Sequence, residues 1–212
     1  MAALATVKSA LKRVPGLQSA YGLIRPFVAH GGLKDQWARV VMNRETEALI
    51  QSIGPEDKSA LEISGQSWLT RAKFKTFRSI NFPEYDVCAG PLGHEKFDVV
   101  IAEQVFEHLL WPYRAVRNVC EMLNPGGAFL VTTPFLLKVH HYPVDCSRWT
   151  ELGIRHLLAE GGFDPGRITT GSWGNRDCVQ ANFPRWQIYQ SWRHSLKNEP
   201  NFPIVVWALA RK

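Results

Sequence analysis

The apolar run 97–102 (FDVVIA) constrains the fold of this chain more than any other segment. A strand with one wet face alternates apolar and polar residues, whereas a strand covered on both faces is apolar nearly throughout. The run therefore predicts a strand buried between two layers of helices. The runs 60–64, 128–132 (AFLVT) and 203–210 (PIVVWALA) have a similar character. Together they indicate a mainly parallel sheet.

Strand and helix signals alternate along most of the chain. The segment 112–123 predicts a helix because Pro112 suits a first turn and Val116, Val119, Cys120 and Leu123 share one face. A second helix is expected from Thr150, as its cap, to about Glu160. The predicted strands are 60–64, 77–81, 85–88, 97–102, 128–132, 167–170 and 203–210. The predicted fold class is α/β, with a doubly wound, mainly parallel seven-stranded sheet.

The first part of the chain is predicted to be helical. Helices are expected at 3–13, 17–29 and roughly 36–52, and Gly54-Pro55 ends the last of them. We therefore predict an N-terminal helical extension over residues 1–58 and an α/β domain over residues 59–212. The basic start MAALATVKSALKRVPG lacks a secretory pattern. It suits a short amphipathic helix that makes weak contact with a membrane surface, or one that docks on the domain.

Composition excludes several classes of protein. The 212 residues include 45% hydrophobic and 21% charged residues, which is typical of a soluble globular chain. No apolar run approaches the roughly 20 residues that span a bilayer. The net charge of +6 is not concentrated in a basic block, so nucleic acid is not an expected partner. The four cysteines are widely spaced, which favours a reduced, cytoplasmic protein without structural zinc.

Polar residues gather after the predicted strands. The carboxyl ends of parallel strands meet at one edge of a sheet, where ligands bind. This edge carries more acids than bases, and the chain has neither a phosphate-binding P-loop nor G-x-G-x-x-G after a strand. A cationic or hydroxyl-rich ligand is therefore favoured, although loops are polar in general.

Three segments together resemble the class I S-adenosylmethionine-dependent methyltransferases. They are 61–65 (LEISG), 97–109 (FDVVIAEQVFEHL) and 121–135 (EMLNPGGAFLVTTPF). The segment 143–163 is similar to the ending of small methyltransferases of sugar or cell-envelope biosynthesis. The resemblance covers about residues 60–163. It implies a methyltransferase with S-adenosylmethionine as cofactor.

The resemblance also implies roles for particular residues. It places Glu62 at the acid that engages the methionyl ammonium and Asn81 where an acid holds the ribose hydroxyls. It places Asp86 near the contact with the adenine amino group. The complete set of implied cofactor-binding residues is Glu62, Ser64, Gly65, Gln66, Asn81, Asp86, Glu103, Gln104 and His108.

Two features depart from the family pattern. The loop Ser64–Gln66 has one glycine where the family has several, which costs backbone freedom at positive φ. Asn81 is an amide where the family has an acid, so a charge-assisted hydrogen bond is lost. Only about a dozen residues separate Ser64 from Phe77, so the first crossover helix is expected to be a turn or two or a loop.

Candidate catalytic residues follow the strand 128–132. His140, His141 and Asp145 lie where an acceptor would enter, and histidine is the natural base near neutral pH. Packing roles for the histidines and an ion pair between Asp145 and Arg148 are alternatives. A metal site is not expected, because His140, His141, Asp145 and Cys146 lack a characteristic ligand spacing. Trp173, Trp186 and Trp192 suit either an acceptor lid or packing.

The function predicted from the sequence is methyl transfer from S-adenosylmethionine to a small-molecule or sugar-containing acceptor, at oxygen. One alternative is a catalytically inactive binding or scaffold module that keeps the fold. Another is a membrane-surface accessory protein led by the basic N-terminus. The sequence does not specify the oligomeric state.

Overall fold

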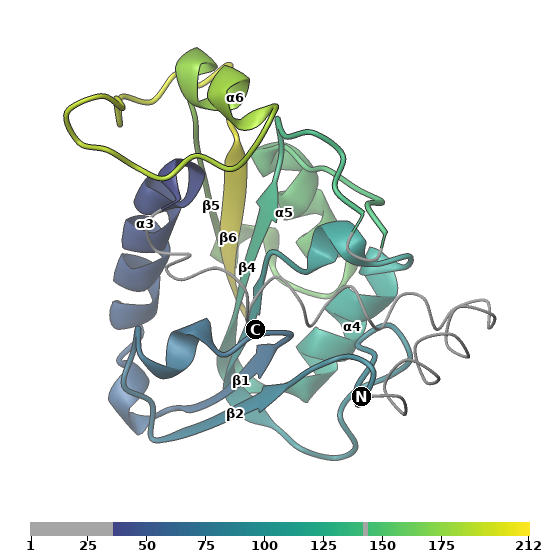
Figure 1. Cartoon of the computed structure of the whole chain (residues 1–212). Helices are drawn as coiled ribbons and strands as arrows, with labels where there is room; N and C mark the ends of the chain where they lie inside the picture. The colour runs from purple at the N-terminus through teal and green to yellow at the C-terminus, as the bar shows by residue number, and fades with distance from the viewer. Residues whose placement is uncertain (1–35, 142–143) are drawn as a thin grey trace, which may run out of the picture.

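The structure is a computed structural model and describes residues 36–141 and 144–212. A six-stranded sheet with the order β2-β1-β3-β4-β6-β5 lies at its centre (Figure 1). The strands are β1 (Ser59–Ile63), β2 (Thr76–Ile80), β3 (Phe97–Glu103), β4 (Leu123–Pro134), β5 (Ile168–Trp173) and β6 (Val205–Arg211). β1 to β4 pair in parallel, and β6 runs antiparallel to both of its neighbours.

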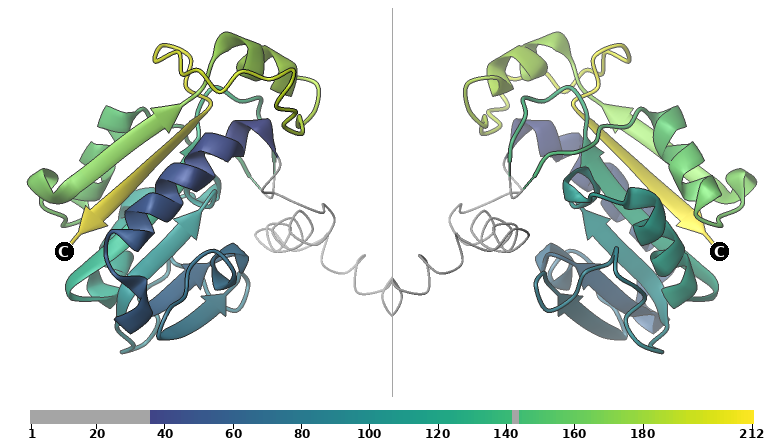
Figure 2. Two further views of the ribbon diagram at one scale, coloured as in Figure 1. Left: turned by 90° about the vertical axis from the view of Figure 1, so that its left-hand side faces the viewer. Right: turned by 90° about the vertical axis from the view of Figure 1, so that its right-hand side faces the viewer.

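Helices cover both faces of the sheet. α3 lies on one face, and α4 and α5 lie on the other (Figures 1 and 2). The helices are α3 (Val40–Gln51), α4 (Pro112–Met122), α5 (Glu151–Glu160) and α6 (Arg176–Asn182). Single 3-10 turns are η2 (Trp37–Arg39), η3 (Pro55–Asp57), η4 (Ser67–Leu69), η5 (Phe106–His108) and η6 (Pro165–Arg167). The predicted doubly wound α/β class is confirmed.

Alternate residues of β3 pack into the hydrophobic core on opposite faces of the sheet. Val99 and Ile101 pack into the core cluster on the α3 side, while Val100 and Ala102 pack into the cluster on the α4 and α5 side. All four side chains are fully buried. The run is apolar on both faces because helices cover both faces.

The two helices predicted beyond β3 are present. α4 begins at Pro112, and its buried residues include Val116 and Val119. The Thr150 hydroxyl accepts a hydrogen bond from the Gly153 amide at 3.1 Å, which caps α5 as expected. A Cβ on Gly161, directly after α5, would collide with Val116, so glycine lets α5 approach α4 closely.

The predicted strand 85–88 is wrong, and the described residues therefore form six strands instead of seven. The segment forms turns because its amides find local acceptors. The Cys88 amide donates to the Asp86 carboxylate at 2.8 Å, and the Ala89 amide donates to the Asp86 carbonyl at 3.0 Å. A side chain that offers such a bond competes with a sheet ladder.

The short crossover between β1 and β2 contains η4 and no α-helix, as predicted. Trp68 covers the sheet face there. Its side chain is fully buried in the cluster that includes Ala60, Val99 and Ile101. One indole thus covers apolar surface between β1 and β3.

The predicted N-terminal extension is described only from Gln36 onward, and the helices predicted at 3–13 and 17–29 lie outside the described residues. α3 packs its buried face on the sheet, with Met42 and Ile50 fully inside the core. The part of the extension that the structure describes is therefore one layer of the α/β unit. None of the helices within the described ranges is long and apolar enough to cross a membrane.

Candidate active site at the carboxyl ends of the strands

The turn after β1 keeps a backbone shape that normally calls for glycine. Ser64 has a φ of 59°, and its amide donates to the Ile80 carbonyl at 2.8 Å. The Ser79 hydroxyl donates to the Gly65 carbonyl, which ties the loop to β2. A left-handed conformation costs about 1–2 kcal/mol for a residue with a Cβ. Ser64 thus adopts a left-handed backbone conformation that glycine adopts more readily.

Glu62 is held by its own loop. Its Oε1 accepts from the Ser67 amide and hydroxyl, both at 3.1 Å, and its Oε2 accepts from the Trp68 amide at 2.9 Å. Gly65 lies so close to this carboxylate that a Cβ would collide with it. Burial raises the pKa of Glu62 to about 7, partly offset by the Trp68 amide and reinforced by the charge of Glu103.

This raised pKa predicts a pH dependence of stability. The folded protein holds a proton on Glu62 up to about pH 7, whereas the unfolded chain releases it near 4.5. The contribution of Glu62 to the free energy of unfolding is therefore fully present below pH 4.5, and it is lost as the pH rises through 7. The loss is on the order of 3 kcal/mol. This loss is measured by urea unfolding of the wild type and of Glu62→Gln between pH 5 and 8. The wild type should lose more stability than the variant, and parallel curves would show that Glu62 does not titrate there.

Glu103, at the end of β3, is the centre of a buried ion cluster. Its Oε1 pairs with Arg39, and its Oε2 accepts from Arg71 at 2.5 Å and from the Trp68 indole at 3.0 Å. Arg71 also pairs with Glu47 of α3 at 2.7 Å. Burial raises the pKa of Glu103, but the two arginines outweigh it and hold that pKa below its usual range. This cluster fastens η2 and α3 to the sheet.

The remaining residues predicted to bind the cofactor line the same edge. Asn81 follows β2 directly and is half-buried, and the Gln66 side chain is exposed. The Asp86 carboxylate is occupied by the Cys88 amide. Gln104 has a φ of 57°, and its side chain donates to the Thr132 hydroxyl at 3.1 Å. Their contacts with a cofactor stay predictions.

A second polar group lies beyond the ends of β3 and β4. One ligand-type atom each of Glu107, His108 and His140 lies within 4.8 Å of the others. Glu107 is fully buried, and its carboxylate has no hydrogen-bond partner among the described residues. Burial raises the pKa of Glu107 to about 8, against the opposing effects of its own backbone amide and Arg148. Burial lowers the pKa values of His108 and His140.

Of the predicted catalytic residues, His140 and Asp145 are in contact, and His141 is not part of this group. The His140 amide donates to Asp145 at 2.8 Å, and Asp145 also accepts both guanidinium hydrogen bonds of Arg148. Burial raises the pKa of Asp145, but Arg148 and the His140 amide lower it to about 2. His141 is exposed. The structure therefore brings His140 and His108 together, gives Asp145 the ion pair foreseen as an alternative, and leaves His141 at the surface.

Sequence reasoning missed the partners of the acids. The sequence pattern does not mark Glu107, Arg39 or Arg71 as members of a site. The pair 107–108 after a buried strand was the available signal for Glu107. Nothing in the spacing of Arg39 and Arg71, which lie 64 and 32 residues from Glu103, points to their ion pairs.

The three tryptophans considered for an acceptor lid lie in different environments. α6 and the segment after it lie beyond the ends of β4 and β5 (Figures 1 and 2). Trp173 is buried in the core, whereas Trp192 is exposed. Trp186 meets the His140 ring edge-on at 5.9 Å between centroids. Only Trp186 of the three lies beside the polar group, so the lid interpretation is restricted to it.

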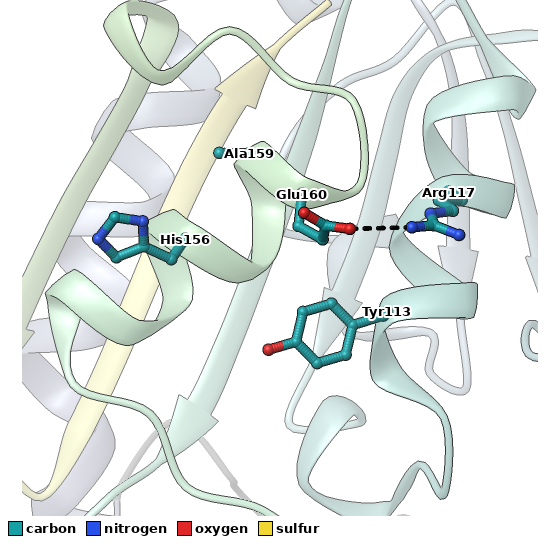
Figure 3. A pocket seen from close by; sticks show the side chains of 5 residues that line it. All are labelled: Tyr113, Arg117, His156, Ala159 and Glu160. Atoms are coloured by element: carbon teal, nitrogen blue, oxygen red, sulfur yellow. Dashed lines mark hydrogen bonds and ion pairs between the residues drawn. The ribbon is translucent and has the colours of Figure 1, made fainter.

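A separate depression lies between α4 and α5. It is lined by Tyr113, Arg117, His156, Ala159 and Glu160, and an ion pair of 3.0 Å joins Arg117 to Glu160 across it (Figure 3). All five residues belong to the helix layer. This depression is not built from the strand ends, and its exposed ion pair is of the kind that contributes little to stability.

Comparison with known proteins identifies what this chain resembles. Residues 49–131, which are 83 of the 212 residues, match the sequence pattern of the family described as "Methyltransferase domain". Over this segment the chain is similar to the S-adenosylmethionine-dependent methyltransferases. The chain is 28% identical, over 121 residues, to the thiol S-methyltransferase TMT1A of Homo sapiens. The match covers 52% of this chain and 44% of the human protein, so it spans less than half of that relative.

Solved structures share the fold of this chain. The cyclase SpnF gives a TM-score of 0.57 at 15% identity, over 91% of this chain and 93% of that chain. An S-adenosylmethionine dependent methyltransferase from Mesorhizobium loti gives a TM-score of 0.51 at 14% identity, over 82% of this chain and 98% of that chain. The comparisons support the predicted resemblance to S-adenosylmethionine-dependent methyltransferases, by sequence over residues 49–131 and by fold over most of the chain.

Proposed function

We propose that the protein transfers a methyl group from S-adenosylmethionine to a small-molecule or sugar-containing acceptor, at oxygen. The observation that carries this proposal is the joint placement of two groups at one sheet edge. The turn after β1, with Ser64 at a φ of 59°, lies at the end of the sheet to which β3 and β4 bring Gln104 and the polar group of Glu107. The family of residues 49–131 supports the reaction type.

The residues after β1 and β2 fit this cofactor. Ser64 preserves the glycine-like turn, and Gly65 keeps the backbone free of a side chain. Asn81, directly after β2, offers an amide to the ribose hydroxyls. S-adenosylmethionine supplies an electrophilic methyl group on a sulfonium. The side chains of this edge position the acceptor and take up the proton that its hydroxyl loses, which lowers the barrier mainly through proximity.

The first test is calorimetric titration with S-adenosylhomocysteine. We expect saturable binding by the wild type and about 3- to 10-fold tighter binding by Asn81→Asp, because charge-assisted hydrogen bonds are roughly twice as strong as neutral ones. Asn201→Asp makes the same change at an exposed position after α6 and should leave the affinity unchanged. Equal affinities of the wild type and Asn81→Asp would place the ribose contact elsewhere.

The acceptor is tested separately with a labelled methyl donor. Hydroxyl-bearing sugars and small alcohols form one arm, and small thiols form the other, because the human relative is named as a thiol S-methyltransferase. Label in the hydroxyl arm supports transfer to oxygen. Label in thiols alone would overturn the oxygen assignment and retain the reaction type.

A second candidate function is a catalytically inactive binding module. Two observations favour it. Both oxygens of Glu62 and both oxygens of Glu103 already bind protein donors. The loop Ser64–Gln66 also has one glycine where the family that the chain resembles has several. Absence of S-adenosylhomocysteine binding at millimolar concentration would support this candidate.

A membrane-surface role for the basic N-terminus concerns residues outside the described ranges. Co-sedimentation with anionic vesicles, comparing the full chain with a chain that begins near Gly31, tests this role directly.

A further inference from the structure

Glu107, His108 and His140 form a compact group of three ligand-type side chains. η5 supplies Glu107 and His108, and the segment after β4 supplies His140. The group lies beyond the ends of β3 and β4. Two imidazoles and one carboxylate are the ligand set of several catalytic zinc sites.

Glu107 lacks what a buried carboxylate requires. It is fully buried, and neither of its oxygens has a hydrogen-bond partner among the described residues. An unpaired buried carboxylate is costly unless a proton, a donor or a metal ion compensates it. The carboxylates of Glu62 and Glu103, at the same edge of the sheet, both accept hydrogen bonds from protein donors, whereas the Glu107 carboxylate accepts none from the described residues.

The tautomer of His108 sharpens this point. Its Nδ1 lies 2.6 Å from the Val144 carbonyl oxygen, which can only accept, so Nδ1 carries the proton. The neutral ring then presents the lone pair of Nε2 toward Oε1 of Glu107, at 3.5 Å. With Glu107 ionised, as a metal ligand has to be, two acceptors face each other at a distance too long for a good hydrogen bond. Two ligands bound about 2.1 Å from one tetrahedral ion lie about 3.4 Å apart.

We propose that Glu107, His108 and His140 bind a divalent transition-metal ion, with Zn²⁺ as the ion that suits them best. The bond from His108 to a carbonyl is the arrangement that fixes metal-binding histidines. The Oδ2 of Asp145 lies 3.2 Å from Nδ1 of His140, but this nitrogen has no hydrogen-bond partner among the described residues. The positive charge of Arg148 repels a metal ion only weakly, because its guanidinium is paired with the Asp145 carboxylate.

The proposal changes the expected role of His140 from proton acceptor to metal ligand. Three protein ligands leave a coordination position for a small molecule. A bound Zn²⁺ lowers the pKa of a coordinated hydroxyl or thiol. Activation of an acceptor by the metal rests on the proposed methyl transfer. The proposed binding of the metal does not depend on that function.

Metal binding is measured on the full, untagged chain after chelator treatment. Zn²⁺ is titrated against a chromophoric chelator, and Co²⁺ is titrated with its visible absorption as a second readout. We expect one equivalent of Zn²⁺ per chain and a tetrahedral Co²⁺ spectrum. Glu107→Gln and His140→Ala should each weaken Zn²⁺ binding by at least about 100-fold, since loss even of an outer partner costs 10–100-fold.

Matched controls separate this site from surface histidines. His94→Ala and His156→Ala remove histidines outside the group and should leave the Zn²⁺ affinity unchanged. Circular dichroism shows whether each variant folds, and His140→Ala, at a half-buried position, serves if Glu107→Gln does not fold. Sub-stoichiometric Zn²⁺, or full affinity in a folded variant, would overturn the proposal. S-adenosylhomocysteine titration of the metal-free protein tests the proposed function independently.

Discussion

Replacing Glu103 by glutamine is expected to lower the free energy of unfolding by about 3–5 kcal/mol, the usual cost of breaking a buried ion pair. Glu103 is the common partner of Arg39 and Arg71, and the side chains of both acid and bases are nearly inaccessible. The variant leaves two buried guanidinium groups without their shared carboxylate. Urea denaturation at pH 7 measures the change.

Glu160→Gln is the matched control for this prediction. Glu160 pairs with Arg117 at the surface, where both side chains are more than half exposed. Its replacement should cost less than about 1 kcal/mol. If Glu103→Gln costs no more than the control, water reaches the two arginines and the cluster is not closed.

Replacing Trp68 by alanine is expected to cost about 3–5 kcal/mol of unfolding free energy, as for other large buried side chains. The indole is fully buried on the sheet between β1 and β3. Alanine leaves a cavity there, and it also removes the donor to Glu103 and the ring beneath Arg71, whose Cζ lies 4.0 Å from the ring centroid.

Two further variants separate the contribution of the buried volume from that of the hydrogen bond and provide a surface control. Trp68→Phe keeps most of the apolar volume and loses the hydrogen bond, so we expect a cost of about 1.5–3 kcal/mol. Trp192→Ala removes an 80% exposed tryptophan and should change stability by less than about 0.5 kcal/mol. Equal losses for Trp68→Ala and Trp192→Ala would mean that the indole of Trp68 does not support the sheet.

The parts of the fold that sequence predicted are those with strong local signals. The run 97–102 and the helices after Pro112 and Thr150 are set by periodicity and by caps, which involve neighbouring residues. The strand at 85–88 failed for a local reason of another kind. The Asp86 side chain satisfies the amide that a strand would have given to its neighbour.

The site was less predictable because its acids are distinguished by their partners. Glu62 lies within β1, Glu103 ends β3, and Glu107 follows in η5, so all three are acids at or near strand ends. In the structure one caps its own loop, one is paired with two arginines, and one has no partner among the described residues. Those differences depend on residues such as Arg39, which is distant in sequence and supplied by another element.

The fold alone does not fix the reaction. The structure of SpnF, named as a cyclase, superimposes on 91% of this chain. Function must therefore be argued from the side chains at the strand ends. For this protein the distinguishing groups are the loop Ser64–Trp68 and the group of Glu107, His108 and His140.

The short turn η2 has a consequence for how the protein is divided into fragments. Trp37 stacks on His194 at 4.0 Å and hydrogen bonds to the carbonyls of Gln187 and Ser195, while Arg39 reaches Glu103. These few residues join the late tryptophan-rich segment to the middle of the sheet. A fragment that starts at residue 59 would therefore lose one of the two arginines of Glu103 and the contacts that anchor the C-terminal third. The smallest autonomous unit has to begin no later than Gln36.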